Sequence, residues 1–305
     1  MPLSLGLKVD IDTLIGTRRG LPAMLDLFTR LNIRGTFYVS LGPDRTGRKV
    51  LDAWRSGMVA KAGRTNVLGA LGIRTLLYGT LLPAPIIHRA AQAQLRQLRD
   101  SGFETGVHAW DHVQWHRQLA QLPRDIIARL LQQSHEIFTS VFGRPPETYA
   151  APGWTVSRDY FALIDAMRMT YLSDTRGVSP FYPIFAGYQS STLQLPTTLA
   201  TLDELLGRQT EQEIIDYYVA EIARGQFNVM TIHTEYEGGV HLDLFTRLVR
   251  ALKAREVNIT GLGEMAQVRS AGSSWPHAAC AMETVDGRAI PIARQSGMES
   301  SAFTT

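Results

Sequence analysis

Two aspartates stand one residue apart at the end of an apolar run near the start of the chain. In "LKVDIDTLIG", residues 7–16, Asp10 and Asp12 flank Ile11. Side chains alternate between the two faces of a strand, so these carboxylates point the same way. Like charges held that close repel, and one ionises poorly unless a cation lies between them. The pair predicts a metal site, or a proton shared at a working site.

A pair of histidines supplies ligands of a second type. The run "GVHAWDHVQWH" places His108 and His112 four positions apart, with Asp111 and His116 beside them. We expect His108 at the carboxyl end of a strand and His112 one turn later, so that both imidazoles reach one metal ion. Such pairs also occur as ordinary surface or capping residues, and Asp111 and His116 add no specificity.

Asp12, His108 and His112 together form a ligand set suited to one divalent ion, namely zinc, manganese, cobalt or nickel. The ion would lower the pKa of its water and polarise a carbonyl oxygen, leaving positions open for a substrate. Asp10 can then accept the proton as the water attacks. One aspartate is predicted to hold the ion and the other to act as the base.

Two further apolar runs end in polar side chains. "VMTIHTEYEGG" ends a strand in His233, and "YLSDTRG" ends another in Asp174, followed by Arg176. At the mouth of a barrel, His233 can protonate a leaving amine, and Asp174 can orient His233 and keep it protonated. The alternative interpretations are a core histidine and two surface charges.

Strands that end at one edge must position these side chains. Strand-like runs fall at 5–11, 34–41, 103–110, 148–154, 169–174 and 227–235. Helical runs lie between them, at 21–31, 88–102, 123–143, 157–169 and 211–224. This alternation predicts parallel strands in an α/β barrel or a doubly wound sheet. We expect one catalytic domain over 1–267 and a poorly ordered tail over 268–305.

The composition, with 45% apolar and 19% charged residues, is that of a soluble globular protein. The single cysteine, Cys280, excludes an internal disulfide framework and suits a reducing compartment. The opening "MPLSLGLKVD" has no basic region followed by a cleavable apolar segment, so we expect no secretory signal and a cytoplasmic location.

Residues 45–89 carry eight Lys or Arg against one acid, which gives +7 and leaves −4 for the rest of a chain whose net charge is +3. Within this segment, 67–87 is the most apolar stretch, but Arg74 and two prolines argue against a membrane span. Two interpretations stay open. The segment is a buried helical insertion, or it is an interfacial segment that meets anionic lipid.

The combination of motifs resembles the polysaccharide deacetylase (NodB-homology) superfamily over residues 5–265. It consists of Asp-x-Asp at a strand end, His-x-x-x-His, a Pro-Gly-Trp turn and a later histidine at a strand end. The resemblance implies a distorted (β/α) barrel and metal-assisted hydrolysis of N-acyl sugars.

Within the superfamily, stretches such as "AAPGW", "SDTRG" and "TIHTEYEGG" are similar to the deformylases of a lipid-linked formamido-sugar. This resemblance implies release of formate from 4-deoxy-4-formamido-L-arabinose-phosphoundecaprenol, in lipid A modification and polymyxin resistance. It also implies a peripheral protein at an anionic membrane surface, on the cytoplasmic face of the inner membrane, with no nucleic-acid partner.

Carried over residue by residue, the resemblance makes Asp10 the base and His233 the acid. The metal ligands it implies are Asp12, His108 and His112. The Pro-Gly-Trp turn, with Gly153 and Trp154, is expected to bind substrate.

One departure concerns the arginine that the superfamily places just before this turn to pair with the base. Here Ala150 and Ala151 precede the turn. Either the base is tuned differently, or another cation such as Arg176 substitutes, approaching Asp10 or a substrate phosphate.

Two other functions compete with the deformylase. One is an N-deacetylase of another amino sugar, which the basic and apolar segment does not favour. The other is a non-catalytic sugar- or lipid-binding module that keeps a structural metal. Asp10 and His233 argue against the module, because simple binding requires neither a base nor an acid.

Overall fold

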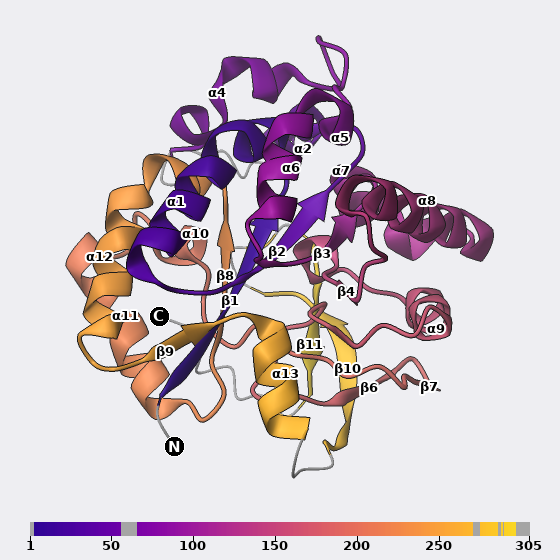
Figure 1. Ribbon diagram of the computed structural model, residues 1–305. Helices are drawn as coiled ribbons and strands as arrows, with labels where there is room; N and C mark the ends of the chain where they lie inside the picture. Colours follow the sequence, from indigo (N-terminus) through magenta and orange to yellow (C-terminus); the bar gives the residue numbers. More distant parts are fainter. Residues whose placement is uncertain (1–2, 56–65, 271–274, 286–287, 289, 297–305) are drawn as a thin grey trace.

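A computed structural model describes residues 3–55, 66–270, 275–285, 288 and 290–296 of the chain (Figure 1). Its centre is a parallel sheet in the order β5-β4-β3-β2-β1-β8, with β9 also paired to β1. The strands are β1 Ser4–Ile11, β2 Thr36–Ser40, β3 Glu104–Ala109, β4 Thr148–Tyr149, β5 Tyr171–Leu172, β8 Val229–His233 and β9 Asn258–Thr260.

An irregular extended segment joins the two ends of this strand order. Leu195 donates its N–H to the carbonyl of Leu172 on β5, over 2.8 Å. Three residues later, Thr198 donates to the carbonyl of Val229 on β8, over 3.0 Å. The sheet is therefore curled into a barrel that is distorted where this segment replaces a regular strand.

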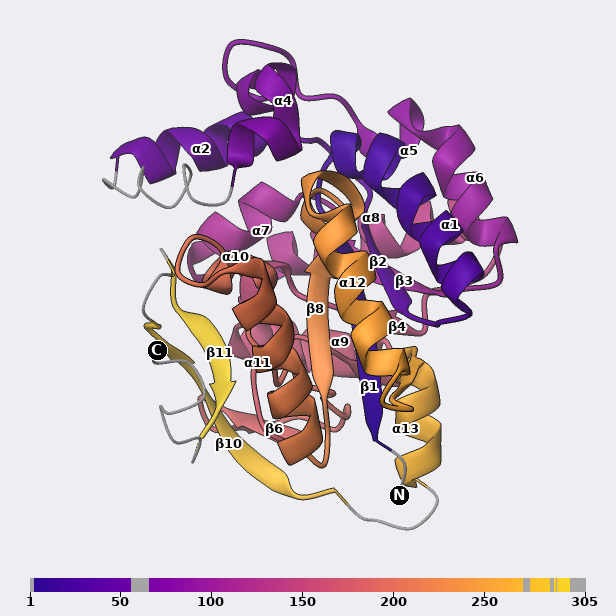
Figure 2. The same ribbon diagram turned by 90° about the vertical axis from the view of Figure 1, so that its left-hand side faces the viewer.

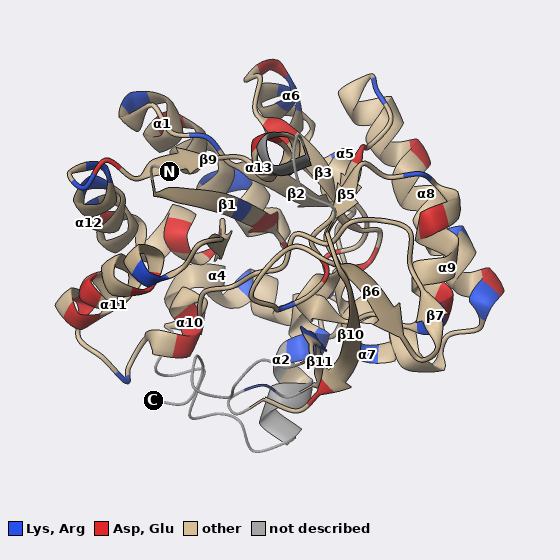
Figure 3. Ribbon diagram, turned by 90° about the horizontal axis from the view of Figure 1, so that it is seen from below, with Lys and Arg blue, Asp and Glu red and all other residues tan. Residues whose placement is uncertain are grey.

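Helices cover the outside of the curled sheet (Figures 1 and 2). They are α1 Leu21–Leu31, α5 Ile87–Ala90, α6 Gln92–Asp100, α7 His112–Gln118, α8 Arg124–Phe142, α9 Arg158–Ala166, α10 Leu202–Leu205, α11 Glu211–Arg224, α12 Leu242–Lys253 and α13 Leu262–Ser270. Charged residues gather on the outer helices, for example α8, α11 and α12 (Figure 3). The apolar faces of these helices pack toward the sheet, as amphipathic helices on a barrel must.

The insertion, residues 45–89, contains α2 Thr46–Arg55 and α4 Val67–Leu77. Both helices lie above the carboxyl ends of the strands (Figures 1 and 2). Arg45, just before α2, pairs with Asp111 at the start of α7 and so ties the insertion to the mouth of the barrel. No helix among the described residues is long and apolar enough to cross a bilayer.

The predicted poorly ordered tail over 268–305 is wrong for the residues that the structure describes there. β10 His277–Glu283 and β11 Ile292–Gln295 pair with each other, and β10 also pairs with β6 Tyr182–Phe185. With β7 Tyr188–Gln189 they form a second sheet beside the barrel (Figure 2). The sequence pattern is too irregular to show this pairing, because the tail completes a sheet whose other strands lie about a hundred residues earlier.

Candidate metal-dependent hydrolytic site

Strand β1 supplies the first part of the site. Leu7, Val9 and Ile11 face the apolar core and are fully buried. The alternation of the strand places Lys8, Asp10 and Asp12 on the opposite side. A strand built for the core therefore carries one cation and two carboxylates on its inner face, at the end where parallel strands open into a mouth.

Three predicted ligands meet at this mouth. The Nε2 atoms of His108 and His112 lie 3.2 Å and 3.1 Å from the two carboxylate oxygens of Asp12. One ligand atom from each of the three residues lies within 4.8 Å of the others. This is the spacing and donor chemistry of a divalent-cation site with one carboxylate and two imidazoles.

Asp12 also carries a buried oxygen suited to a metal. Its Oδ1 lies 3.2 Å from Nε2 of His108 but accepts no hydrogen bond of good geometry from the residues that the structure describes. A buried carboxylate oxygen without a donor is costly unless a cation satisfies it. Asp12, His108 and His112 thus fit one divalent ion as a group, and the prediction that they come together agrees with the geometry.

The turn between β3 and α7 aims the two histidines at Asp12. Ala109 adopts a φ of 129°, a conformation that residues with a side chain rarely take. Asp111 then caps α7 by accepting the N–H of Gln114 over 2.9 Å. His112 is consequently the first residue of the helix, and its ring centre lies 5.3 Å from that of His108.

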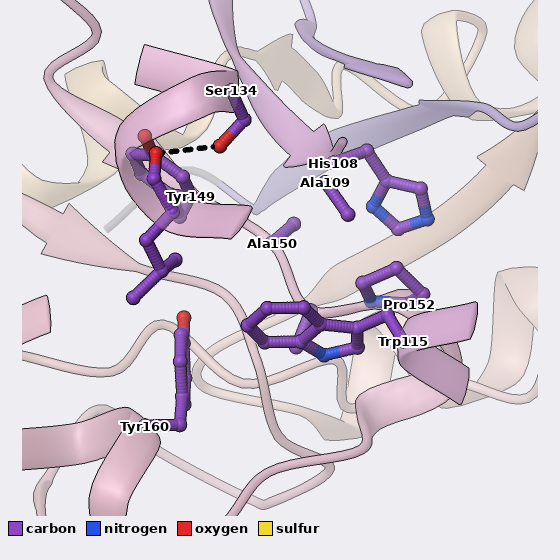
Figure 4. Close-up of a pocket in the computed structure, with 10 residues that line it drawn as sticks. His108, Ala109, Trp115, Ser134, Tyr149, Ala150, Pro152 and Tyr160 are labelled. Carbon is purple, nitrogen blue, oxygen red and sulfur yellow. Dashed lines mark hydrogen bonds between the residues drawn. The ribbon is translucent and has the colours of Figure 1, made fainter. Parts of the chain in front are cut away.

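His108 is supported from behind by an aromatic pocket (Figure 4). Trp115 donates its indole N–H to the carbonyl of Thr155 over 3.0 Å, and it meets Tyr160 edge-on at 5.2 Å. Pro152 closes the pocket beside the imidazole. These rigid side chains restrict the orientation of His108, as the surroundings of a metal ligand are expected to do.

The electrostatics of Asp12 and His112 suit their roles as ligands. Burial opposes the ionisation of Asp12, but the neighbouring imidazoles of His112 and His108 hold the pKa of its carboxyl well below the usual value. Burial lowers the pKa of His112, which keeps that ring neutral. A deprotonated carboxylate and a neutral imidazole are the forms that bind a metal.

Lys8 provides the cation beside the predicted base. Its Nζ lies 3.2 Å from Oδ2 of Asp10, and both side chains are almost fully buried. Removing one partner of such a pair leaves an uncompensated buried charge, which costs about 3–5 kcal/mol. Lys8 thus holds Asp10 in place, a role that the sequence reasoning missed. The sequence did offer a sign of this role, because Lys8 stands two positions before Asp10 and therefore on the same face of the strand.

The predicted approach of Arg176 to Asp10 is corrected by this ion pair. Arg176 is buried and instead donates to Glu204 over 3.1 Å and to the carbonyl of Leu199 over 3.0 Å. Its backbone pairs with the hairpin β10–β11. The physical reason is register: Lys8 shares a strand with Asp10, whereas Arg176 follows β5, at the far end of the strand order.

The predicted contact between Asp174 and His233 is also absent from the described hydrogen bonds. Asp174 accepts the N–H of Ala151 over 2.7 Å, together with donors from Tyr160 and Gln194. Burial raises the pKa of Asp174 to about 6. Its carboxyl therefore fixes the start of the Pro-Gly-Trp turn rather than the orientation of His233.

His233 lies next to Asp10, because the two residues are register partners on the adjacent strands β8 and β1. Its backbone N–H donates to Oε2 of Glu237 over 2.8 Å. Neighbouring residues of a parallel pair point to the same face, so His233 shares the mouth with the base. The predicted placement of His233 at the same mouth agrees with this register.

Gly153 and Trp154 lie beside His116 and Lys8, respectively. A side chain on Gly153 would come within 2.2 Å of the His116 ring, so this glycine makes room for that histidine. Trp154 is 3% exposed, and little of its ring is open to a substrate. The predicted contact of these two residues with substrate stays a prediction.

A second residue that the sequence reasoning missed is Glu235. One oxygen of its buried carboxyl accepts the N–H groups of Asp12 and Thr13 over 3.1 Å and 2.7 Å. Burial and the charge of Asp12 raise the pKa of Glu235 to about 8. Glu235 therefore fixes the loop that carries Asp12. Its place directly after the His233 strand was the only sign in the sequence.

Comparison with known proteins gives the family. Residues 10–172 match the family described as Polysaccharide deacetylase. The chain is also 31% identical, over 299 residues, to a Shewanella sediminis protein named probable 4-deoxy-4-formamido-L-arabinose-phosphoundecaprenol deformylase ArnD, covering 96% of this chain and 95% of that protein. The chain belongs to the polysaccharide deacetylase family. As a member of this family it is a hydrolase of amide bonds.

Another relative and two solved structures of the deacetylase type agree with the family. A Wigglesworthia glossinidia brevipalpis protein with the same name is 26% identical over 227 residues, covering 73% of this chain and 79% of that protein. A candidate polysaccharide deacetylase from Mycobacterium smegmatis superposes with a TM-score of 0.62 at 16% identity, covering 90% of this chain and 93% of the other. The peptidoglycan deacetylase PdaC from Bacillus subtilis gives 0.52 at 13% identity, covering 88% and 93%. The predicted distorted barrel is confirmed.

The ligand assignment makes a first prediction. The double variant His108→Ala/His112→Ala should lose the bound divalent ion, because a single carboxylate remains where three ligands meet. Metal content measured by mass spectrometry after dialysis tests this. His116→Ala is the matched control and should keep the ion. Full metal occupancy in the double variant would contradict the assignment.

A second prediction concerns stability and pH at Glu237. Burial raises the pKa of this carboxyl to about 8, above its usual value of 4.5, so the folded protein holds a proton that the unfolded chain releases. Its contribution to stability is therefore present below pH 4.5 and is lost as the pH rises through about 8.

Glu237→Gln should remove this dependence of stability on pH, because an amide does not ionise. The amide oxygen can still accept the N–H of His233, so that hydrogen bond is kept. Thermal unfolding midpoints measured from pH 5 to pH 8.5 should fall less for the variant than for the parent protein. Parallel curves for the two proteins would show that Glu237 is ionised throughout this range.

Proposed function

We propose that the protein is a metal-dependent deformylase of 4-deoxy-4-formamido-L-arabinose-phosphoundecaprenol, releasing formate and the free 4-amino sugar. The observation that carries the proposal is the placement of Asp10 between the Asp12–His108–His112 set and His233 at one mouth. The names of two relatives, of which one is similar over nearly the whole chain, support the formamido-sugar as substrate. Lipid A modification and polymyxin resistance belong to this proposal.

The proposed mechanism assigns one task to each group. An ion bound by Asp12, His108 and His112 supplies Lewis-acid chemistry toward a carbonyl and a water, and zinc, manganese, cobalt and nickel all suit these ligands. Asp10, held by Lys8, accepts the proton of the attacking water at its carboxylate.

His233 acts in the second half of the proposed reaction. Expulsion of an amine requires a proton on its nitrogen, and the imidazole of His233 donates it as general acid. The backbone bond to Glu237 and the register opposite Asp10 keep His233 at the mouth. Acid and base then stand on adjacent strands, on either side of the scissile amide.

The insertion supports a membrane-bound substrate. Leu68, Ile73 and Leu81 of the insertion are 61%, 68% and 81% exposed, and Arg74 beside them is exposed as well. Exposed apolar side chains flanked by cations suit the interface of an anionic bilayer. A polyprenyl carrier does not leave the bilayer readily, since each methylene exposed to water costs about 0.8 kcal/mol.

We therefore assign the protein to the cytoplasmic face of the inner membrane, as a peripheral protein. The insertion lies above the mouth of the barrel, so docking through it brings the site to the lipid headgroups. Two of the eight cations of residues 45–89, Lys61 and Arg64, lie outside the described residues.

The activity is tested on the purified, metal-loaded protein. Mass spectrometry should detect the free amino sugar after incubation with the formamido-arabinose lipid, and a chelator should abolish its formation. Asp10→Asn should lower turnover by about a hundredfold or more while the ion stays bound, because the amide does not accept a proton. His233→Ala should impair turnover in the same way.

Two outcomes would contradict these assignments. Hydrolysis of N-acetyl sugars in preference to the formamide would favour the N-deacetylase interpretation. Loss of the ion in Asp10→Asn would show that the roles of the two aspartates are exchanged.

Membrane docking is tested with liposomes of anionic lipid. Replacing Leu68, Ile73 and Leu81 together by Ser should reduce sedimentation with the liposomes and slow turnover of the lipid substrate. Hydrolysis of a water-soluble formamido-sugar should be unchanged. Val178→Ser/Ile184→Ser, which changes exposed apolar residues away from the insertion, is the matched control. Undiminished binding by the triple variant would favour the interpretation of the segment as a packed insertion.

A further inference from the structure

The indole of Trp154 is surrounded by cations that come from distant parts of the chain. The guanidinium carbons of Arg288 and Arg176 lie 4.8 Å and 4.9 Å from the centre of the ring. Trp154 also donates its Nε1–H to Thr197 over 3.2 Å. Cations attract the face of a buried indole, so these contacts restrain the position of the ring.

Glu204 locks the two guanidinium groups together. Arg176 donates to its carboxylate over 3.1 Å, and Arg288 donates to Oε1 from Nη2 and Nε over 2.6 Å and 2.9 Å. Burial opposes the charge of Glu204, but the two arginines outweigh it and hold the pKa of this carboxyl at about 2. The carboxylate is therefore ionised and keeps both arginines against the ring.

The same indole touches the cation of the proposed base. The ammonium of Lys8 lies 5.3 Å from the centre of the Trp154 ring and 3.2 Å from the carboxylate of Asp10. Trp154 thus packs against the buried ion pair of Lys8 and Asp10. If the ring were free to move, water would reach the buried ion pair, and the direction of the Asp10 carboxylate would be less fixed.

From these contacts we propose that Arg288 is a positioning residue of the hydrolytic site. With Arg176 it clamps Trp154, and the clamped ring keeps Lys8 against Asp10. Arg288 touches none of the proposed catalytic groups, and it acts through the tryptophan. It lies beyond residues 10–172, which match the deacetylase family, so the C-terminal segment completes the site. The inference rests on the proposed amide hydrolysis.

The test compares Arg288→Ala, Arg288→Lys and the control Arg294→Gln on a water-soluble formamido-sugar, so that membrane docking does not contribute. Arg294 lies in the same hairpin and pairs with Glu283 on the adjacent strand. Arg288→Ala should lower kcat by roughly tenfold to a hundredfold, with KM within about twofold of the parent and metal content unchanged. Arg288→Lys should recover most of kcat, because its ammonium still reaches Glu204 and the ring.

A spectroscopic measurement follows the clamp without activity. In protein labelled with 5-fluorotryptophan, the 19F resonance of Trp154, assigned through Trp154→Phe, should shift or broaden in Arg288→Ala and return in Arg288→Lys. A rise in KM with kcat intact would make Arg288 a substrate contact and overturn the inference. An equal loss of kcat in Arg294→Gln would also overturn it, since the effect would then belong to the hairpin as a whole.

Different results would contradict the proposed function and the positioning role of Arg288. A parent protein that releases no formate from any formamido-sugar contradicts the proposed function, whatever the fluorine spectra show. A parent protein that is active, with an unchanged kcat and an unchanged Trp154 resonance in Arg288→Ala, contradicts the positioning role alone.

Discussion

The alternation of side chains along β1 is the constraint on which the rest of the site depends. Because successive residues face opposite sides, one strand buries Leu7, Val9 and Ile11 in the core and places Lys8, Asp10 and Asp12 at the mouth. A shift of one residue would exchange the two sets and put three charges into an apolar core. Fold and chemistry are therefore fixed by the same register.

The charged groups on β1 are paired with neighbouring side chains, and further carboxyls around them bind the backbone. Lys8 neutralises Asp10, and Asp12 faces the two imidazoles in a set that fits a divalent ion. Carboxyls farther out hold the backbone in place: Glu235 binds the loop of Asp12, and Glu237 binds the strand end of His233. In a buried site each of these groups would be costly alone, so their mutual pairing makes the arrangement rigid.

Side-chain contacts also link the barrel to the parts of the chain outside it. The insertion reaches the mouth through Arg45 and Asp111, and the C-terminal segment reaches it through Arg288 and Trp154. The insertion carries exposed apolar residues, and the indole of Trp154 packs against Lys8. This division suits the proposed hydrolysis of a lipid-linked sugar.

The sequence by itself determined which polar side chains stand at the carboxyl ends of β1, β3 and β8, and their donor types. Asp-x-Asp, His-x-x-x-His and the histidine at the end of β8 were recognisable because short spacings fix which local face a side chain occupies. Tertiary structure alone decided the partners of those residues. Lys8 rather than Arg176 pairs with Asp10, Asp174 holds the turn at Ala151, and the C-terminal residues form a hairpin that reaches Trp154. The contacts of Asp174 and of the C-terminal hairpin join residues far apart in the chain. The pair of Lys8 and Asp10 is local, but the sequence did not show that Arg176 would lie elsewhere. Sequence periodicity carries information about faces, whereas ion pairs and sheet closure depend on distances that only the packed chain sets.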